Sequence, residues 1–240
     1  MNRCEELIRQ GVIVLLALVS FFESGCTYSQ KYNASIPNLE GTGLAFARNS
    51  SLQQQLNLID LPEFLLSIKP LNARLVSKIN SWFLFIPVPF NRVYPEAERF
   101  GQNDQSASSP FLIEIALSRS IGEVLVDPSQ LTLHLAGQDY TPKRMIMPSD
   151  LRSIRASRLG ITRCVRKNNF PLQEMARPIH TIQIVQGEMA CIWLSFDAAP
   201  PPPETEFSLT VNGIKVAGRT VQIPTIQFIK GVAYVYDSVP

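Results

Sequence analysis

Alternation between apolar and polar residues is the feature that most restricts what this chain can fold into. Two runs show it, SPFLIEIALS at residues 109 to 118 and QLTLHLAG at residues 130 to 137. In the second run, leucines alternate with Thr132 and His134. A period of two is typical of a β-strand with one face buried and one face in water. We therefore expect two half-buried strands, with Glu114 on the polar face of the first.

Two further runs extend this prediction. In EMACIWLSF, residues 188 to 196, both alternating sets are largely apolar, which is typical of a strand covered on both faces in the middle of a sheet. FSLTVNGIKV, residues 207 to 216, has Asn212-Gly213 at its centre, and this pair favours the positive φ angles of a type I′ turn. We expect a hairpin in which Val211 pairs with Ile214.

The strand-like runs together predict a fold class. EVLVDPSQ at residues 123 to 130 indicates a strand that turns at Asp127, and more runs follow between residues 220 and 236. Short strands without a long helical period between them predict a mainly β fold, an immunoglobulin-like antiparallel β-sandwich over residues 49 to 240. One or two short helices are expected at residues 50 to 79, where Asp60 begins an N-cap pattern and Pro70 ends the segment. The prolines at 200 to 203 predict a stiff connection between strands.

The N-terminus has the composition of an export signal. Residues 11 to 22, GVIVLLALVSFF, carry no charge. A helix that spans a bilayer needs about 20 apolar residues, so this segment is short for a permanent anchor. Residues 1 to 25 are therefore expected to be a cleaved signal peptide outside the fold.

The end of this segment, Ser24-Gly25-Cys26, resembles the lipobox of bacterial lipoproteins, in which the cysteine is acylated and becomes the new N-terminus. The resemblance implies lipidation of Cys26 and a membrane anchor, and Thr27 after the cysteine implies sorting to the outer membrane, facing the periplasm. Glu23 departs from the pattern, since an apolar residue is usual there. The alternative is ordinary secretion with Cys26 kept as a thiol. Polar residues follow, so residues 26 to 48 are expected to be the lipidated cysteine and a flexible tether.

Cysteine usage follows from this cleavage. Cys4 leaves with the signal and Cys26 takes the lipid, which leaves Cys164 and Cys191 as an even pair in an oxidising compartment. They are candidates for a disulfide bond. The alternative is that Cys191 is a small buried hydrophobic residue.

No motif in the sequence names a reaction. His134 is expected on the polar face of its strand, whereas His180 shares its alternation with Ile182 and Ile184 and is expected in the core. The chain lacks the spaced motifs of common hydrolases, nucleotide-binding proteins and zinc sites. We therefore expect no enzymatic activity, no cofactor and no metal, with an envelope hydrolase that uses a serine or His180 as the less favoured alternative.

Charge is concentrated in one segment. Residues 143 to 177 carry nine Lys and Arg residues against Asp150 and Glu174, a net charge of +7 in a chain whose total is +2. Neither a helical nor a strand period separates its apolar residues from its arginines, so we expect an irregular or briefly helical insertion. The candidate anion-binding residues are Arg152, Arg155, Arg158, Arg163, Arg166 and Lys167. The alternative is a solvated loop that offsets acidic neighbours.

These features predict a class of function. The pattern resembles that of uncharacterised bacterial envelope lipoproteins with immunoglobulin-like domains. That resemblance implies a membrane-anchored, non-enzymatic binding or scaffolding module whose partner is another envelope protein or an anionic envelope component, and not nucleic acid. The alternative within this class is a lipoprotein subunit of a secretion or transport assembly.

Overall fold

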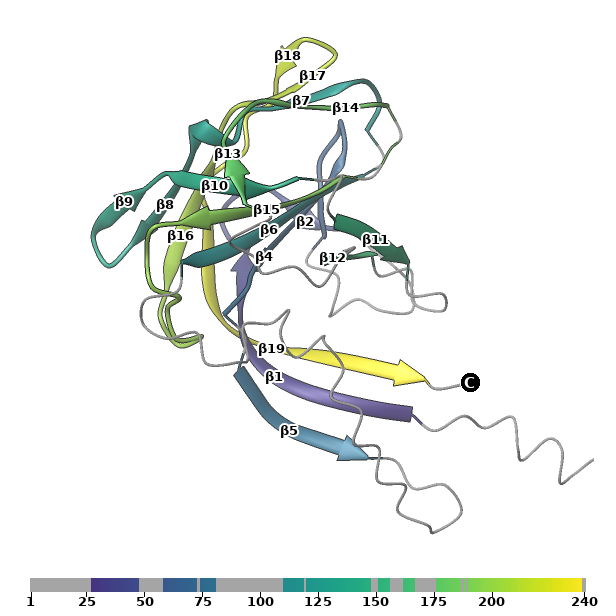
Figure 1. The fold of residues 1–240 in the computed structure, drawn as a ribbon, viewed down its shortest axis with the longest axis vertical. Coiled ribbons are helices and arrows are strands. Elements are labelled where there is room, and N and C mark those ends of the chain that lie inside the picture. Colours follow the sequence, from purple (N-terminus) through teal and green to yellow (C-terminus); the bar gives the residue numbers. More distant parts are fainter. Residues whose placement is uncertain are drawn as a thin grey trace, which may run out of the picture. The chain divides into compact units, whose positions relative to one another are not determined.

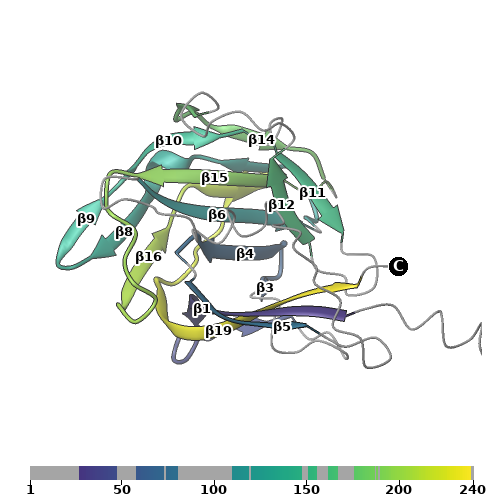
Figure 2. The ribbon, with the colours of Figure 1, turned by 60° about the horizontal axis from the view of Figure 1, so that its bottom comes forward.

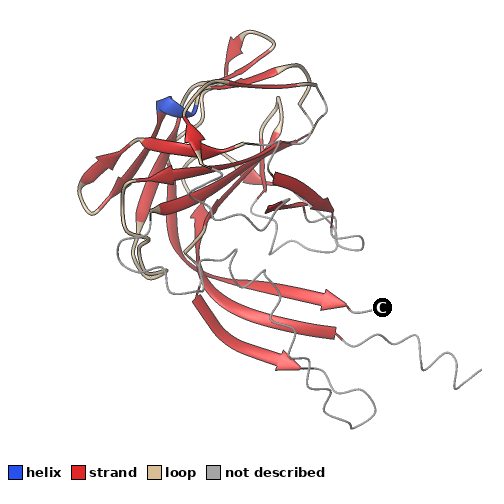
Figure 3. Ribbon diagram, viewed as in Figure 1, coloured by secondary structure: helices blue, strands red, loops and turns tan. Residues whose placement is uncertain are grey.

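The computed structural model describes the backbone of residues 27–47, 58–72, 74–80, 110–118, 120–147, 151–155, 162–166, 176–186, 188 and 190–238. Side chains are described for the same residues except 27–32, 74–80, 151–155, 162–166 and 233–238. The described residues form strands β1 to β19 and one 3₁₀ turn, η1 (Pro128–Gln130). Figure 3 shows this strand-dominated architecture. The predicted mainly β, antiparallel sandwich is confirmed.

A seven-stranded sheet has the order β13-β10-β15-β6-β4-β3-β2. Its strands are β2 (Ala45–Phe46), β3 (Leu58–Asp60), β4 (Leu65–Pro70), β6 (Phe111–Ser118), β10 (Pro142–Ile146), β13 (Arg177–Pro178) and β15 (Ala190–Phe196). Neighbouring strands pair antiparallel. Strand β15 lies between β10 and β6 and is buried along nearly its whole length, so the predicted central strand is confirmed.

A six-stranded sheet has the order β5-β1-β19-β16-β8-β9. Its strands are β1 (Thr27–Asn38), β5 (Arg74–Asn80), β8 (Leu131–Leu135), β9 (Gln138–Tyr140), β16 (Phe207–Val211) and β19 (Ile226–Ser238). Strand β8 buries its three leucines and leaves Thr132 and His134 half-buried, as the alternation predicted. Figures 1 and 2 show this sheet and the seven-stranded sheet from two directions.

Two smaller sheets complete the described structure. A four-stranded sheet, order β14-β7-β17-β18, contains β7 (Val124–Val126), β14 (Ile182–Ile184), β17 (Ile214–Val216) and β18 (Arg219–Thr220). A two-stranded sheet pairs β11 (Leu151–Arg155) with β12 (Thr162–Arg166). The 143–177 segment was expected to be irregular or helical. That expectation is wrong where the structure describes it, because the segment supplies strands β10 to β13.

One hydrophobic core is shared by the two large sheets and the four-stranded sheet. Ile113 of β6, Leu133 of β8 and Ile214 of β17 are among its fully buried members. An aromatic contact crosses the core, where the ring of Phe207 meets Phe111 edge-on at 5.6 Å and stacks on Phe228 at 4.9 Å. Burial of such apolar surface contributes about 25 cal/mol per Å², so this core is the main source of stability.

The tether prediction is wrong for the residues that follow Cys26. Thr27–Asn38 form β1, which lies between β5 and β19 in the six-stranded sheet. Asn72 is buried beside this strand, where its Nδ2 donates to Ser35 Oγ at 2.8 Å and to Pro201 O at 3.0 Å. The second bond ties this part of the chain to the proline segment, which connects β15 to β16.

The helices expected at residues 50 to 79 do not form in the described part of that range. Residues 58 to 80 supply β3, β4 and β5. The N-cap pattern at Asp60 belongs to the turn between β3 and β4, where Leu61 N donates to Phe64 O at 3.1 Å. A turn uses the same residue types as a helix start because both need side chains that accept hydrogen bonds from nearby backbone groups.

The predicted Asn212-Gly213 hairpin is also wrong. Val211 pairs with Leu131 in the six-stranded sheet, whereas Ile214 pairs with Val126 in the four-stranded sheet, so the two residues are a crossover between sheets. Type I′ conformations occur instead at two Ala-Gly pairs, where both residues have positive φ. These pairs are Ala136-Gly137, which joins β8 to β9, and Ala217-Gly218, which joins β17 to β18.

Contacts divide the chain into two compact units. The described residues of the first are 27–31, 76–80 and 234–238, which are parts of β1, β5 and β19. The second holds the described residues of 32–75 and 93–233, including the hydrophobic core.

Candidate functional site

Three exposed cations lie at the β13 edge of the seven-stranded sheet. Strand β10 pairs with β15 on one side and with β13, the outermost strand, on the other. Lys143 and Arg144 of β10 are exposed, as is Arg177 of β13. We call these three residues the basic edge.

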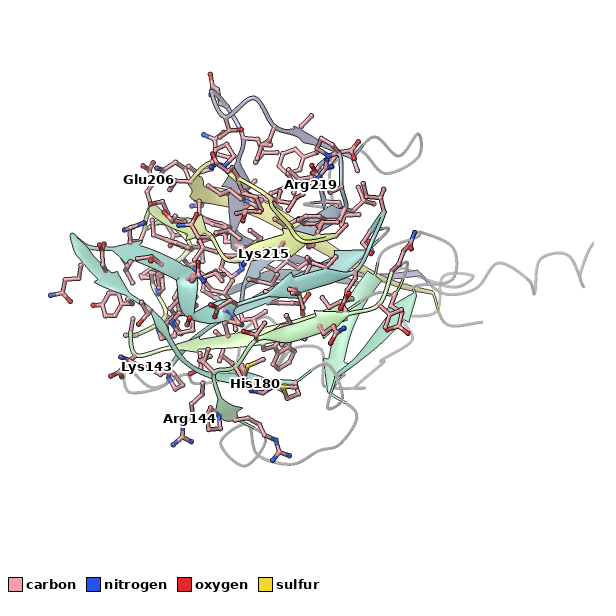
Figure 4. All side chains as sticks on the ribbon, turned by 90° about the horizontal axis from the view of Figure 1, so that it is seen from above. Lys143, Arg144, His180, Glu206, Lys215 and Arg219 are labelled. Atoms are coloured by element: carbon pink, nitrogen blue, oxygen red, sulfur yellow. The ribbon has the colours of Figure 1, made fainter. Side chains whose placement is uncertain are left out.

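A β-bulge explains why two consecutive residues of β10 are exposed. The register shifts between Pro142, which pairs with Phe196, and Arg144, which pairs with Ser195. Lys143 is therefore the extra residue, and a bulge of this kind breaks the strict alternation of side chains. Pro142 and Met145 on either side of the pair stay buried. Figure 4 shows Lys143 and Arg144 at the periphery, directed away from the ribbon.

The cations of the basic edge have no carboxylate partner in the part of the chain that the structure describes. Ion pairs there join Lys69 to Glu114 and Lys230 to Glu204, and the remaining close contact of this kind is between His134 and Asp139. Arg144 pairs in register with Pro178, and Arg177 with Met145, so the two arginines lie on adjacent strands, one position apart in the register. Exposed cations on adjacent strands at one edge of a sheet create a positive potential that attracts anionic ligands.

The β11–β12 hairpin carries four of the predicted arginines. Its register pairs Arg152 with Val165, Ile154 with Arg163, Arg155 with Thr162 and Leu151 with Arg166. Strand β11 also contacts β15, the neighbour of β10. The structure therefore places four of the six predicted anion-binding residues on one hairpin that contacts β15. Arg158 and Lys167 lie outside the described residues.

Cys191 lies on β15 and is disulfide-bonded. Cys164 lies on β12, where it pairs in register with Ser153 of β11. Because β11 contacts β15, the backbone brings the elements of the two cysteines together. The Cys164 side chain is not among those described, so its pairing with Cys191 stays a prediction, as does the modification of Cys26, which also lies outside the described residues.

A buried polar centre lies on the outer face of the seven-stranded sheet, away from the main core. Glu114, expected at a solvated face, is buried because Trp193 Nε1 donates to its Oε2 at 3.0 Å and Lys69 Nζ lies 3.6 Å from its Oε1. Trp193 also belongs to a second, smaller cluster of buried residues, with Leu112, Ala116 and Cys191. The half-buried prediction for this strand is therefore wrong, since β6 is covered on both faces. A charge buried in this way is tolerated because it is paired and hydrogen-bonded.

The two histidines lie in different surroundings. His134 Nδ1 is 2.6 Å from Asp139 Oδ1, and its Nε2 is 2.9 Å from Thr210 Oγ1, which is itself 2.9 Å from Thr225 Oγ1. A carboxylate, an imidazole and a hydroxyl in this order occur in nucleophilic triads. Here they lie on β9, β8 and β16, which pair side by side, so they join three strands across an exposed face of the six-stranded sheet.

His180 is exposed, so its predicted place in the core is wrong. Its Nδ1 lies 3.0 Å from Pro178 O. Figure 4 shows His180 on the same side of the molecule as Arg144. Among the described residues, no ion pair joins His180 to a carboxylate.

Two acidic side chains have contacts that the sequence pattern did not predict, since Glu114 contacts residues far away in the sequence and Asp127 bonds to side chains of its own turn. Glu114 was recognisable only as a lone acid in an apolar strand. Asp127 accepts from Ser129 N, Ser129 Oγ and Gln130 Nε2, and caps η1. The hydrogen bond from the Ser129 side chain, followed by that from Gln130, lowers the pKa of Asp127 below its usual value.

Comparison with known proteins finds no matching family model, curated protein or solved structure. No helix in the described part of the chain has the length and apolar character needed to cross a membrane. The described residues also hold no group of three or more His, Cys, Asp or Glu side chains suited to bind a metal ion.

Proposed function

We propose that this chain is a membrane-anchored envelope lipoprotein whose β-sandwich acts as a non-enzymatic binding or scaffolding module. The anchor is the acylated Cys26, and Thr27 in the following position favours the outer membrane, facing the periplasm. The sandwich docks an anionic group of another envelope component through the basic edge, and the arginines of the β11–β12 hairpin add to its positive charge.

The observation that carries this proposal is the exposure of Lys143, Arg144 and Arg177 on two adjacent strands without a carboxylate partner in the described residues. An Arg guanidinium binds phosphate or carboxylate through two parallel hydrogen bonds, and each Lys or Arg near an anionic surface contributes about 1 kcal/mol. The bulge and the two-residue β13 fix these cations on a rigid sheet, which lowers the entropic cost of docking.

The test uses the acylated protein in neutral phosphatidylcholine vesicles and measures its docking to separate phosphatidylglycerol vesicles. The variant Lys143→Gln/Arg144→Gln removes two cations of the basic edge. The matched control, Lys215→Gln/Arg219→Gln, removes two exposed cations of the four-stranded sheet. At about 1 kcal/mol for each cation, the first variant should lose roughly 30-fold in docking affinity at low salt and less at high salt.

The control variant should dock nearly as well as the unmodified protein. Equal docking by the two variants would refute a localised binding edge. A parallel measurement with an acidic polysaccharide in solution separates a preference for lipid phosphate from a general preference for anions.

A further inference from the structure

The distance between the proposed anchor and the folded sheet is fixed by where β1 begins. Strand β1 starts at Thr27, the residue that follows Cys26 in the sequence. Consecutive Cα atoms are about 3.8 Å apart, so an acyl group on Cys26 is joined to a strand residue with no spacer between them. This follows from the correction to the expected tether.

The start of β1 lies beside the ends of two other strands. In the six-stranded sheet β1 lies between β5 and β19. Figures 1 and 2 both show the first residues of β1 next to the arrowheads of β5 and β19. Residues 27–31, 76–80 and 234–238 belong to one compact unit. We call these residues the strand-end surface. Neighbouring strands are about 4.8 Å apart, so β5 and β19 are separated by about 10 Å across β1.

The sequence of the strand-end surface suits a membrane interface. It contains Tyr28, Tyr234 and Tyr236, which are three of the six tyrosines in the chain. It also contains Lys31 and Lys78 against a single acid, Asp237. Tyrosine is enriched at the level of lipid headgroups because its ring is apolar and its hydroxyl is polar, and lysine is attracted to anionic headgroups.

We infer that the strand-end surface lies directly against the headgroups of the bilayer that holds the acyl chains, so that the sheet itself, and not a flexible tether, meets the membrane. This inference rests on the proposed function, because it requires Cys26 to be acylated. The lipid chains supply the attachment, and the strand-end surface restricts the orientation of the sheet on the bilayer. A flexible tether between the lipid and the sheet would leave that orientation unrestricted.

The test places an environment-sensitive fluorescent amino acid at Asn80, and separately at Ser238, in the acylated protein reconstituted into vesicles. Headgroup-labelled quencher lipids should strongly quench both positions, because both lie at strand ends beside Thr27. A control protein carries a 12-residue Gly-Ser spacer between Cys26 and Thr27. Such a spacer has an average length of about 20 Å, so quenching at both positions should fall several-fold.

Three outcomes are distinguishable. Strong quenching that falls on insertion of the spacer supports the inference. Weak quenching in protein that stays with the vesicles overturns the inference and leaves the anchor intact. Equal quenching with and without the spacer also overturns the inference, because the link between Cys26 and Thr27 would then not set the distance to the membrane. Protein that does not stay with the vesicles contradicts the anchor and with it the proposed function.

Discussion

The substitution Gly213→Ala tests the crossover between the six-stranded and four-stranded sheets. Gly213 has φ +79°, and its carbonyl accepts a hydrogen bond from Asp127 N at 2.9 Å. A Cβ added there would lie 2.6 Å from Asp127 O and 3.0 Å from Gln130 Cβ. The first contact is with backbone, which cannot move without disturbing the same hydrogen bond.

Two costs add at this position. A left-handed conformation costs an alanine about 1 kcal/mol relative to glycine. Forcing a methyl group against packed backbone costs about 1–3 kcal/mol more. Gly213→Ala should therefore lower the free energy of unfolding by about 2–4 kcal/mol.

The matched control is Gly137→Ala in the turn between β8 and β9. Gly137 has φ +76°, and nothing lies within 4 Å of an added Cβ. Only the conformational cost of about 1 kcal/mol applies. Urea denaturation followed by tryptophan fluorescence should give a midpoint that falls further for Gly213→Ala than for Gly137→Ala, with unchanged m-values. Equal losses would refute the crossover, because a glycine at an open hairpin tip has no backbone to collide with.

Two further predictions concern Cys191 and Asp127. Thiol labelling of denatured, unreduced protein should modify neither Cys164 nor Cys191, because a disulfide bond between them leaves no free thiol. Such a bond closes a loop of about 28 residues and stabilises the fold by roughly 3–4 kcal/mol on the chain-entropy model. Two reactive thiols would contradict the bond. Asp127→Ala should cost about 1 kcal/mol at neutral pH, through loss of a cap. Because the folded-state pKa of Asp127 is lowered, this contribution is present above the ordinary value of 3.8 and is lost as the pH falls below it. Urea midpoints should therefore differ between the variant and the unmodified protein at about pH 7 and converge near pH 2, and an equal difference at both values would contradict the assignment.

Alternation along the sequence predicts which side chains of a strand are buried where the strand's own residues decide this. The leucines of β8 and the two apolar faces of β15 have the burial that their spacing predicted. Glu114 shows the limit of this reasoning. Its burial depends on Lys69 and Trp193, which come from neighbouring strands far away in the sequence. Alternation within one strand contains no information about such partners.

The residue types of the turns predicted the backbone conformation better than they predicted which strands the turns join. Gly213 does adopt the positive φ that the Asn-Gly pair favours, but the strands on either side pair with different neighbours. The hairpins form at Ala136-Gly137 and Ala217-Gly218, where alanine accepts a left-handed conformation at a cost of about 1 kcal/mol. Pairing of the strands within the sheets offsets that cost, and this pairing is a tertiary interaction.

The candidate site was predicted in part. The charge count located the basic segment, and the register now places four of its arginines on the β11–β12 hairpin. It did not single out Lys143, Arg144 and Arg177, because their joint exposure depends on a bulge and on an edge position. Residues 27 to 38 were expected to be a tether because they are polar, yet β5 and β19 flank them in the sheet.

Mass spectrometry of the N-terminal peptide, from protein isolated with bacterial membranes, tests the central claim most directly. The account predicts a chain that begins at Cys26 and carries the added mass of two or three acyl chains. A chain that retains residues 1 to 25, or that begins at Cys26 with an unmodified thiol, would contradict it.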